Sequence, residues 1–339
     1  MYVPTSERKM PTVGNHMTRN PVVVDGDERA GNVAKLMVER DLKRVVVKTD
    51  KGYSVASARL LVRDALMTPD WADRKISSMV RHGLWVKPNV HIKAAAREMA
   101  NNFVGSLLVL EDSKLVGIIT ERDIVKATPD LSIPVEAFMT KHVDMLGPDA
   151  TMREAATAMA HFGYSNIPVH DGSELRKVLT IRDALRALVE GRLDEMILDC
   201  HCGREPVTVN VHDTYGKVKE VLLTKSVDGV LVTKTEGSRK VADIVGIITM
   251  WDMVRTFAHS ISAHVMLEVE SPYLEDVMSE LSKLPRITNF TPVFGECDLV
   301  VRVDAESLDA LTELIMKRIG TIKGVKKSTT MIEALPNPQ

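Results

Sequence analysis

Threonine and aspartate recur together at a fixed spacing in this chain of 339 residues. Three copies of a Thr-x-x-Asp pattern occur, at Thr120 and Asp123, Thr180 and Asp183, and Thr249 and Asp252. A carboxylate can accept hydrogen bonds from two vicinal hydroxyls of a sugar, and a threonine hydroxyl beside it can donate or accept. A helix that begins at these residues adds free backbone N–H groups, which favour a nearby anion. The pattern therefore predicts a site for a sugar that carries an anionic group.

Two of the copies also carry an arginine directly before the aspartate, Arg122 and Arg182. An arginine there could add charge-assisted hydrogen bonds to a phosphate. A second interpretation stays open, because a Thr N-cap with an acidic residue at N3 is close to a capping box. A cap requires neither Gly117 and Gly246, three residues before the threonine, nor repetition along the chain. We therefore favour the binding interpretation.

The copies belong to a repeat of about sixty residues. A fourth, less regular copy, here called the worn copy, ends at Asp64. The four aspartates are then 59, 60 and 69 residues apart, and a period of this size indicates repeated supersecondary units. Leu61 stands in the place of the threonine in the worn copy, which is expected to have lost the hydroxyl and to keep Asp64 only as a helix cap. In the third copy Lys177 stands in the place of the glycine.

Each repeat has the same predicted order of elements. A short turn and strand, such as 17–24, precedes an amphipathic helix, which is clearest where apolar residues recur at helical spacing over 151–159. A buried apolar strand such as 45–47 follows, then the strand that leads into Thr-x-x-Asp, and then a closing helix. One such β-α-β-β-α unit has too little core to be stable alone, so the units are expected to pair.

This order, with its glycine–apolar–apolar–Thr–x–x–Asp string, resembles the cystathionine-β-synthase (CBS) domain over about residues 12–258. The resemblance implies an α+β fold with four CBS motifs in two paired modules. In that family the clefts of a module commonly hold AMP, ADP, ATP or S-adenosylmethionine. The expected motifs are 12–70, 75–130, 133–190 and 195–258. The family places residues of the early strand near the adenine, which here implies Leu84, Val86, Met145 and Val207.

The last part of the chain, 262–335, changes pattern. Alternating and helical periodicities predict the order β-α-β-β-α-β of a ferredoxin-like domain. The predicted strands and helices are 264–270, 273–284, the hairpin 290–303, 307–319 and 325–335.

The string from Phe294 to Val301, followed by 322–325 and 328–330, resembles the effector-binding domain of the leucine-responsive regulator/AsnC family. That resemblance implies a dimer and an effector site, for which Gly295 and Asp298 are the candidates. Both residues also fit ordinary hairpin-turn chemistry. The DNA-binding helix-turn-helix of that family has no counterpart in the sequence.

Composition argues against several classes of protein. The net charge is −2, so no nucleic-acid partner is expected. No apolar run reaches the ~20 residues of a membrane span, and the polar stretch Met1–Thr12 lacks a signal-peptide core. Three cysteines without a framework spacing favour a reducing cytoplasm. Cys200-His201-Cys202 has no second pair, so no metal is expected, and no catalytic motif was found.

We interpret the chain as a non-enzymatic cytoplasmic sensor that forms a homodimer or higher homo-oligomer. AMP, ADP, ATP or S-adenosylmethionine would be its regulatory ligand, and no catalytic cofactor is expected. Its output would pass to a protein target or to the C-terminal domain. Two alternatives stay open: a DNA-associated transcriptional regulator, and a regulatory subunit of a separate enzyme or transporter. The pairing of the two domain types suggests an archaeal source by resemblance.

Overall fold

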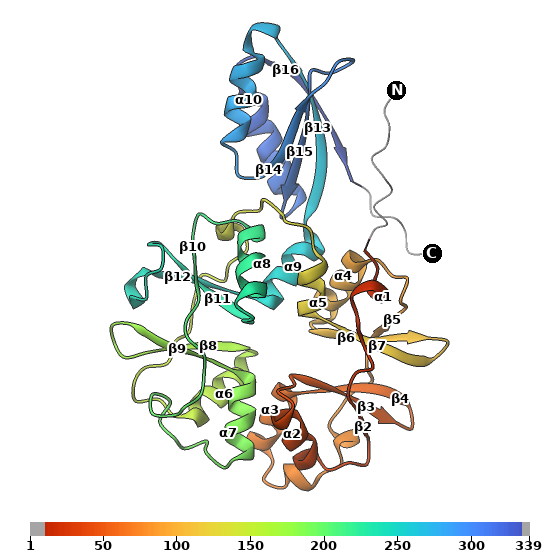
Figure 1. Cartoon of the computed structure of the whole chain (residues 1–339), viewed down its shortest axis with the longest axis vertical. Helices are drawn as coiled ribbons and strands as arrows, with labels where there is room; N and C mark the ends of the chain where they lie inside the picture. Colours follow the sequence, from red (N-terminus) through yellow and green to blue (C-terminus); the bar gives the residue numbers. More distant parts are fainter. Residues whose placement is uncertain (1–10, 334–339) are drawn as a thin grey trace.

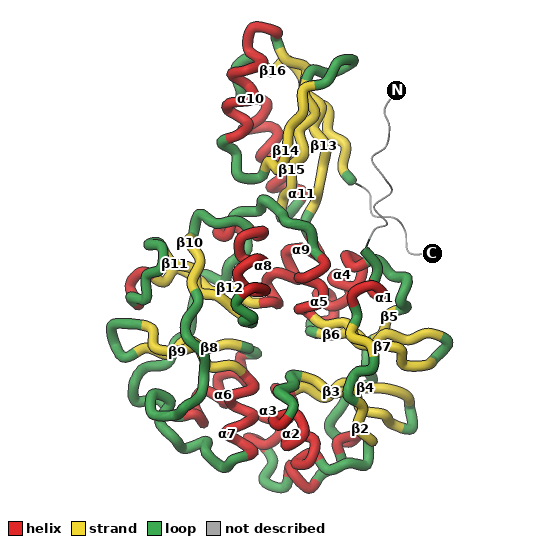
Figure 2. The backbone as a smooth tube through the Cα atoms, in the orientation of Figure 1, coloured by secondary structure: helices red, strands yellow, loops and turns green. Residues whose placement is uncertain are grey.

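The structure is a computed structural model that describes residues 11–333 (Figure 1). Four repeated α/β motifs surround a common centre, and a smaller domain follows them at one end of the molecule. Figure 2 shows strands on the two flanks of the four-motif body and helices gathered between them. The predicted repeat architecture is confirmed.

Each motif has the predicted order of strand, helix, strand, strand and helix, with one exception. Before the first motif lie α1 (Val13–His16) and β1 (Thr18–Arg19). The first motif contains β2 (Val23–Asp25), α2 (Ala30–Glu39), β3 (Arg44–Thr49), β4 (Gly52–Ser57) and α3 (Ala58–Met67). The second contains β5 (Trp85–Val86), α4 (Ile92–Asn102), β6 (Ser106–Glu111), β7 (Lys114–Thr120) and α5 (Glu121–Ala127).

The exception is the third motif, which has no opening strand. It contains α6 (Met152–Phe162), β8 (Asn166–His170), β9 (Leu175–Thr180) and α7 (Ile181–Val189). The fourth motif is complete, with β10 (Thr208–Asn210), α8 (Tyr215–Thr224), β11 (Gly229–Thr233), β12 (Ile244–Thr249) and α9 (Met250–His259).

A proline explains the missing strand. In the second motif the N–H of Leu108 donates to the carbonyl of Leu84 at 2.9 Å, which ties β5 to β6. The strand registers place Pro168 at the position of Leu108 in the third motif. Proline has no N–H to donate, so the ladder cannot extend there. The opening segment therefore meets β8 only at the bridge between Leu146 and Val169.

The opening segments cross between neighbouring motifs. The strand β1, which precedes the first motif, pairs with β7 of the second motif. Equivalent bridges join the segment before the third motif to β12 of the fourth, and the segments before the second and fourth motifs to β4 and β9. Consecutive motifs thus form two modules, first with second and third with fourth. The bridged pairs are Thr18 with Ile118, Thr140 with Ile247, His82 with Ser54, and Arg204 with Val178.

The repeated glycine gives the crossing segment room. A Cβ added at Gly117 would lie 2.7 Å from the sulfur of Met17 and 2.8 Å from the carbonyl oxygen of Thr18. A Cβ at Gly246 would likewise lie 2.7 Å from the sulfur of Met139. The glycine that the sequence marked as part of a binding string is therefore required by the packing of one strand against another.

At the crossing onto β9 the small residue is on the crossing segment and the large residue is on the strand. There the strand carries Lys177, and the glycine is in the crossing segment, where a Cβ at Gly203 would lie 3.1 Å from the carbonyl oxygen of Val178. Gly203, and not its neighbour Cys202, thus takes the position of Met17 and Met139. Gly203 directly precedes the bridging residue Arg204, as each methionine precedes its bridging threonine.

We predict that Gly117→Ala lowers the free energy of unfolding by about 1–3 kcal/mol, because the new methyl group must push the backbone of Thr18 off β7. Urea denaturation measures the change. Gly147→Ala is the control, since a Cβ there meets only a ring carbon of His170 at 3.9 Å. Equal stability of the two variants would show that the close approach is unimportant.

Helices join the two modules. The helices of the first and third motifs share one core, in which Met37, Leu61 and Met152 are fully buried. The helices of the second and fourth motifs share another, which includes Met99 and Tyr215. Each module is thus held by its sheets and crossing segments, whereas the apolar contact between modules is made mainly by helices.

The C-terminal domain has the predicted ferredoxin-like order. It contains β13 (Ile261–Val269), α10 (Leu274–Ser282), β14 (Ile287–Pro292), β15 (Leu299–Ala305), α11 (Leu308–Glu313) and β16 (Val325–Ile332). The sheet order is β14-β15-β13-β16, with antiparallel pairs, and both helices lie on one face (Figure 1). The predicted end of this domain at residue 335 lies outside the described residues.

Helix α9 leads directly into β13, and the second motif holds this junction. The ammonium of Lys93 on α4 donates to the carbonyl oxygen of Ser260 at 2.6 Å and to its hydroxyl at 3.1 Å. Arg97 donates to the carbonyl oxygen of Ala258 at 2.9 Å. These cations satisfy carbonyl groups that a helix end leaves free. Lys93 is only 9% exposed, and burial lowers its pKa to about 8.

The stability contributed by Lys93 should depend on pH. The pKa of an unfolded lysine is ~10.4. Burial lowers the pKa of folded Lys93 to about 8. Below pH 8 both states are charged and the cost of burying the charge is present in full. Between about 8 and 10.4 the folded state loses its proton first, so the free energy of unfolding should rise by up to ~3 kcal/mol relative to Lys93→Met. Urea titrations of both proteins at pH 7 and pH 10 measure it; a constant difference would contradict the prediction.

Candidate functional site

All three Thr-x-x-Asp copies begin helices, as predicted. In the second motif one carboxylate oxygen of Asp123, Oδ2, accepts from the backbone N–H of Thr120 at 2.8 Å and from its hydroxyl at 2.7 Å. Asp183 and Asp252 do the same within their own copies, at 2.7–2.8 Å. Each copy is therefore a capping box, as the second interpretation of the sequence predicted.

The cap uses only one of the two carboxylate oxygens. In two copies the other oxygen, Oδ1, contacts the crossing segment of the neighbouring motif. In the third copy Oδ1 of Asp183 accepts from the N–H of Gly203 at 3.3 Å, and in the fourth Oδ1 of Asp252 accepts from the hydroxyl of Thr140 at 3.4 Å. These bonds are long, so a better donor can replace them. The cap and a ligand contact are thus compatible in one aspartate.

The first copy was aligned wrongly. Residue pairing in the sheets places Ser57, opposite Arg44, where Thr120 lies opposite Ser106. Ser57 caps α3 and accepts from the N–H of Leu60 at 3.2 Å. The first copy therefore keeps its hydroxyl and has Leu60 in the place of the aspartate.

Asp64, which sequence comparison took as the aspartate of this copy, is not a helix cap. It lies in the middle of α3, about one turn past Leu60, which occupies the place of the capping aspartate. Its carboxylate pairs with Arg74 at 3.0 Å. By the corrected alignment Arg59 corresponds to Arg122 and Arg182. Three of the four motifs therefore carry an arginine at this position, which sequence comparison missed for the first motif.

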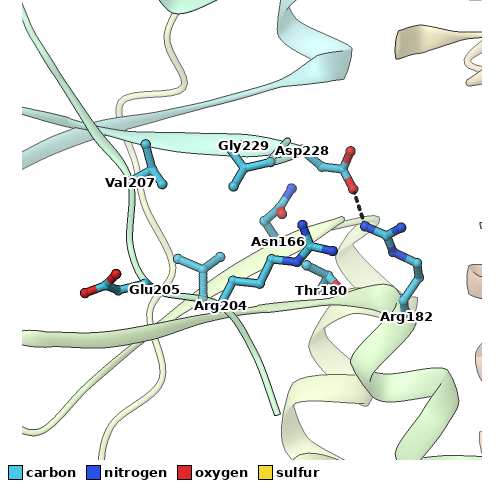
Figure 3. Close-up of a pocket in the computed structure, with 10 residues that line it drawn as sticks. Asn166, Thr180, Arg182, Arg204, Glu205, Val207, Asp228 and Gly229 are labelled. Carbon is cyan, nitrogen blue, oxygen red and sulfur yellow. Dashed lines mark hydrogen bonds and ion pairs between the residues drawn. The ribbon is translucent and has the colours of Figure 1, made fainter. Parts of the chain in front are cut away.

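A cleft opens between the third and fourth motifs (Figure 3). Thr180 and Arg182 line it from one side, and Val207 and Asp228 from the other. Arg204 extends along the cleft from the crossing segment toward Thr180. Side chains fill most of this space, and the free volume of about 10 Å³ has room for about one water molecule. A larger molecule can enter only if charged side chains move.

The crossings decide which predicted residues meet. Val207 follows a segment that crosses to the third motif, and so lies in the cleft with Thr180 and Arg182. By the same rule Met145 follows the segment that reaches Asp252 of the fourth motif through Thr140.

Leu84 and Val86 are placed differently. They follow His82, which bridges Ser54 of the first motif. Their segment therefore lies beside the first motif, whose copy lacks the aspartate, and not beside Thr120 and Asp123 of their own motif. Sequence comparison could not detect this exchange, because each motif reads as a continuous unit along the chain.

One carboxylate at the centre of the molecule joins all four motifs. Asp228, just before β11 of the fourth motif, pairs with Lys43 of the first motif at 3.3 Å, with Arg122 of the second at 2.8 Å and with Arg182 of the third at 3.0 Å. Its side chain is 8% exposed. The sequence did not mark Asp228, because residues at equivalent positions in the other motifs are of other types.

The charges of this central group depend on one another. Burial would raise the pKa of Asp228, but Lys43, Arg122 and Arg182 outweigh it and hold the pKa well below its usual range. Burial lowers the pKa of Lys43, and Asp228 opposes that shift. Burial also lowers the pKa of Arg59, whose guanidinium donates to the hydroxyl of Ser165 at 3.0 Å. A second carboxylate, that of Glu121, pairs with Arg44 at 3.1 Å and also acts on Lys43 and Arg59. The cations of this group therefore outnumber its two carboxylates.

Comparison with protein-family models matches the CBS domain four times, at residues 13–55, 72–130, 135–190 and 199–259. The chain belongs to the CBS domain family. A second model, the Lrp/AsnC ligand binding domain, matches residues 262–333, so the C-terminal domain of this CBS protein has the predicted type.

Related proteins match parts of this CBS chain. An uncharacterized 17.7 kDa protein of Acidianus ambivalens is 42% identical over 109 residues, 31% of this chain and 66% of that protein. Inosine-5'-monophosphate dehydrogenase of Korarchaeum cryptofilum is 29% identical over 174 residues, 48% of this chain and 36% of that enzyme. The chain thus spans less than two thirds of either relative.

The crystal structure of protein MJ1225 from Methanocaldococcus jannaschii has a TM-score of 0.61 at 18% identity. It covers 73% of this chain and 100% of that one, which supports the fold of the four CBS motifs. Among residues 11–333, no helix is long and apolar enough to cross a membrane.

The structure pairs Cys200 with Cys202 as a disulfide in the loop between the CBS motifs of the second module. The sequence interpretation, which expected no disulfide framework, did not foresee this pairing. Within the described residues, no three His, Cys, Asp or Glu side chains form a group that could hold a metal ion.

The two candidate effector residues of the C-terminal domain lie at the β14–β15 connection. Gly295 has a positive φ of 150°, which suits glycine in a turn. The carboxylate of Asp298 accepts from the N–H of Val269 at 2.7 Å, and so ties the turn to β13. A larger cleft, about 530 Å³, lies elsewhere, between α10 and the turn that follows α11. Its lining includes Tyr273, Glu280, Lys317, Arg318 and Lys323.

We predict that Asp228→Asn lowers the free energy of unfolding by about 3–5 kcal/mol, because it removes the carboxylate that three cations share and leaves Lys43 and Arg122 without a carboxylate partner. Asp41→Asn is the matched control, since Asp41 also pairs with Arg182, at 3.1 Å, but is 53% exposed. Its loss should cost less than ~1 kcal/mol. Thermal and urea unfolding measure both. Similar losses in the two variants would exclude a special role for the central carboxylate.

Proposed function

We propose that this CBS protein is a sensor that binds an adenosine-containing nucleotide in the clefts of its modules. The observation that best supports this proposal is the cleft between the third and fourth motifs. There Arg182 and Val207 line the cleft from two different segments. Asp183, which follows Arg182 at the start of α7 and caps that helix, contacts the crossing segment through the N–H of Gly203. These three side chains match the three chemical parts of a nucleotide.

Each part of the ligand would have its own partner. Oδ1 of Asp183, which is not used by the cap, would accept hydrogen bonds from the ribose hydroxyls in place of its long contact with Gly203. Arg182 would bind phosphate, helped by the free N–H groups at the start of α7. Val207 would pack against the adenine.

The four clefts should not be equivalent. The second and third copies have half-buried aspartates, whereas Asp252 of the fourth is buried, and burial raises its pKa. The first copy has Leu60 in the place of the carboxylate and cannot hold a ribose in the same way. We therefore expect binding at Asp123 and Asp183 before the others, with ligand preference among AMP, ADP, ATP and S-adenosylmethionine set by the phosphate contacts.

The output of the sensor would be a change in packing. A ligand that needs more space than the cleft provides favours the arrangement of motifs in which the cleft is open. The fourth motif continues through α9 into the C-terminal domain, which would form a homodimer, bind an effector or contact a protein target. Gly295 and Asp298 remain the sequence candidates for such an effector.

Isothermal titration with AMP, ADP, ATP and S-adenosylmethionine tests the proposal. We expect micromolar binding of at least one ligand, with loss of one class of sites in Asp183→Ala and another in Asp123→Ala. Asp183→Asn keeps an oxygen for the cap and should retain the stability of the wild type, so that weaker binding would report the ligand contact and not the helix.

Asp64→Ala is the matched control. It removes an aspartate from the equivalent helix of the first motif, where the carboxylate pairs with Arg74 outside the cleft. Binding should be unchanged. No binding by the wild type to any of the four ligands below millimolar concentration would refute the proposed function.

A further inference from the structure

The arginines proposed to bind phosphate already have an anionic partner. Arg122 and Arg182 come from different modules, and both donate to the carboxylate of Asp228, at 2.8 Å and 3.0 Å. Lys43 adds a third cation at 3.3 Å. A carboxylate with several cationic donors around it occupies the electrostatic position that a phosphate group would take.

The same carboxylate restricts the cleft. Asp228 lines the space that Thr180 and Arg182 line from the opposite side, and Figure 3 shows Asp228 and Arg182 pointing toward each other across it. With this ion pair in place the cleft has room for about one water molecule. A phosphate could reach Arg182 only after the ion pair opens.

The repeat itself does not require an acid at this position. The residues that precede the equivalent strands β3, β6 and β8 are Lys43, Gly105 and Ser165. In all four motifs this residue accepts the same hydrogen bond through its backbone carbonyl, from the first residue of the following helix. The backbone therefore carries the structural role, and the side chain of Asp228 is free to serve another.

We propose that Asp228 is an internal counter-anion that competes with ligand phosphate for the central cations and thereby sets the preference of the clefts among adenosine ligands. This inference rests on the proposed function, because it concerns regulation of the same clefts. A ligand with more phosphate charge must displace Asp228 more completely. Displacement breaks ion pairs that link the fourth motif to each of the others, so phosphate binding would loosen contacts between modules.

The test compares adenosine, AMP, ADP and ATP on the wild type and on Asp228→Asn by isothermal titration. We expect ATP to bind at least about tenfold more tightly to the variant, ADP and AMP progressively less so, and adenosine within about threefold of the wild type. An equal change for adenosine and ATP, or weaker ATP binding to the variant, would overturn the inference. Asp41→Asn, which frees Arg182 at the exposed rim, should leave all four affinities within about threefold.

Loss of stability in Asp228→Asn need not prevent the test. Lys43→Met combined with Asp228→Asn removes one cation with the anion and leaves both arginines for phosphate. The same order of affinities is expected for this double variant.

Inorganic tripolyphosphate separates this inference from the proposed function, since it has no ribose or base. It should raise the Tm of Asp228→Asn, or of the double variant, by more than that of the wild type. Equal shifts would reject the counter-anion. A selective shift without binding of any adenosine ligand would reject the proposed function and retain the counter-anion.

Discussion

The exchange of opening segments between consecutive motifs is the constraint on which the rest of this structure depends. A motif of about sixty residues cannot bury enough apolar surface alone, and here each one completes its sheet with a segment of its neighbour. The same exchange builds the cleft between the third and fourth motifs, because the helix that carries Asp183 and the segment that faces it come from different motifs. A ligand bound in this cleft would therefore contact two motifs at once and depend on their relative position.

The sequence was sufficient to predict the period, the order of elements and the C-terminal fold, because apolar periodicity and turn residues specify these locally. It could not show where the repeated order of elements is interrupted. Pro168 cancels one predicted strand, since its missing N–H is the donor that Leu108 supplies in the second motif. Gly203 exchanges roles with the glycine of the other copies, and only the register between strands reveals that exchange.

The candidate site was predicted in part. Thr180 and Arg182 were identified by type and spacing, and Val207 by the resemblance to the CBS domain; the three meet in one cleft. The first copy was misread because Asp64 gave the more regular period, whereas hydrogen bonding in the sheet selects Ser57. The position of Asp228 recurs in every motif, but an acid stands there only in the fourth, so a search for repeated residue types passes over it. Its environment arises only when four motifs bring their charges to one point.

Helix α9 connects the centre of the four motifs to the C-terminal domain. The helix begins at the Thr249 cap, one strand from Asp228, and ends at Ser260, which Lys93 of the second motif holds. It therefore spans from the centre of the molecule to the junction with β13. A packed helix transmits displacement along its length more readily than it bends. A shift of the fourth motif against the second would consequently strain the contact between Lys93 and Ser260 at this junction.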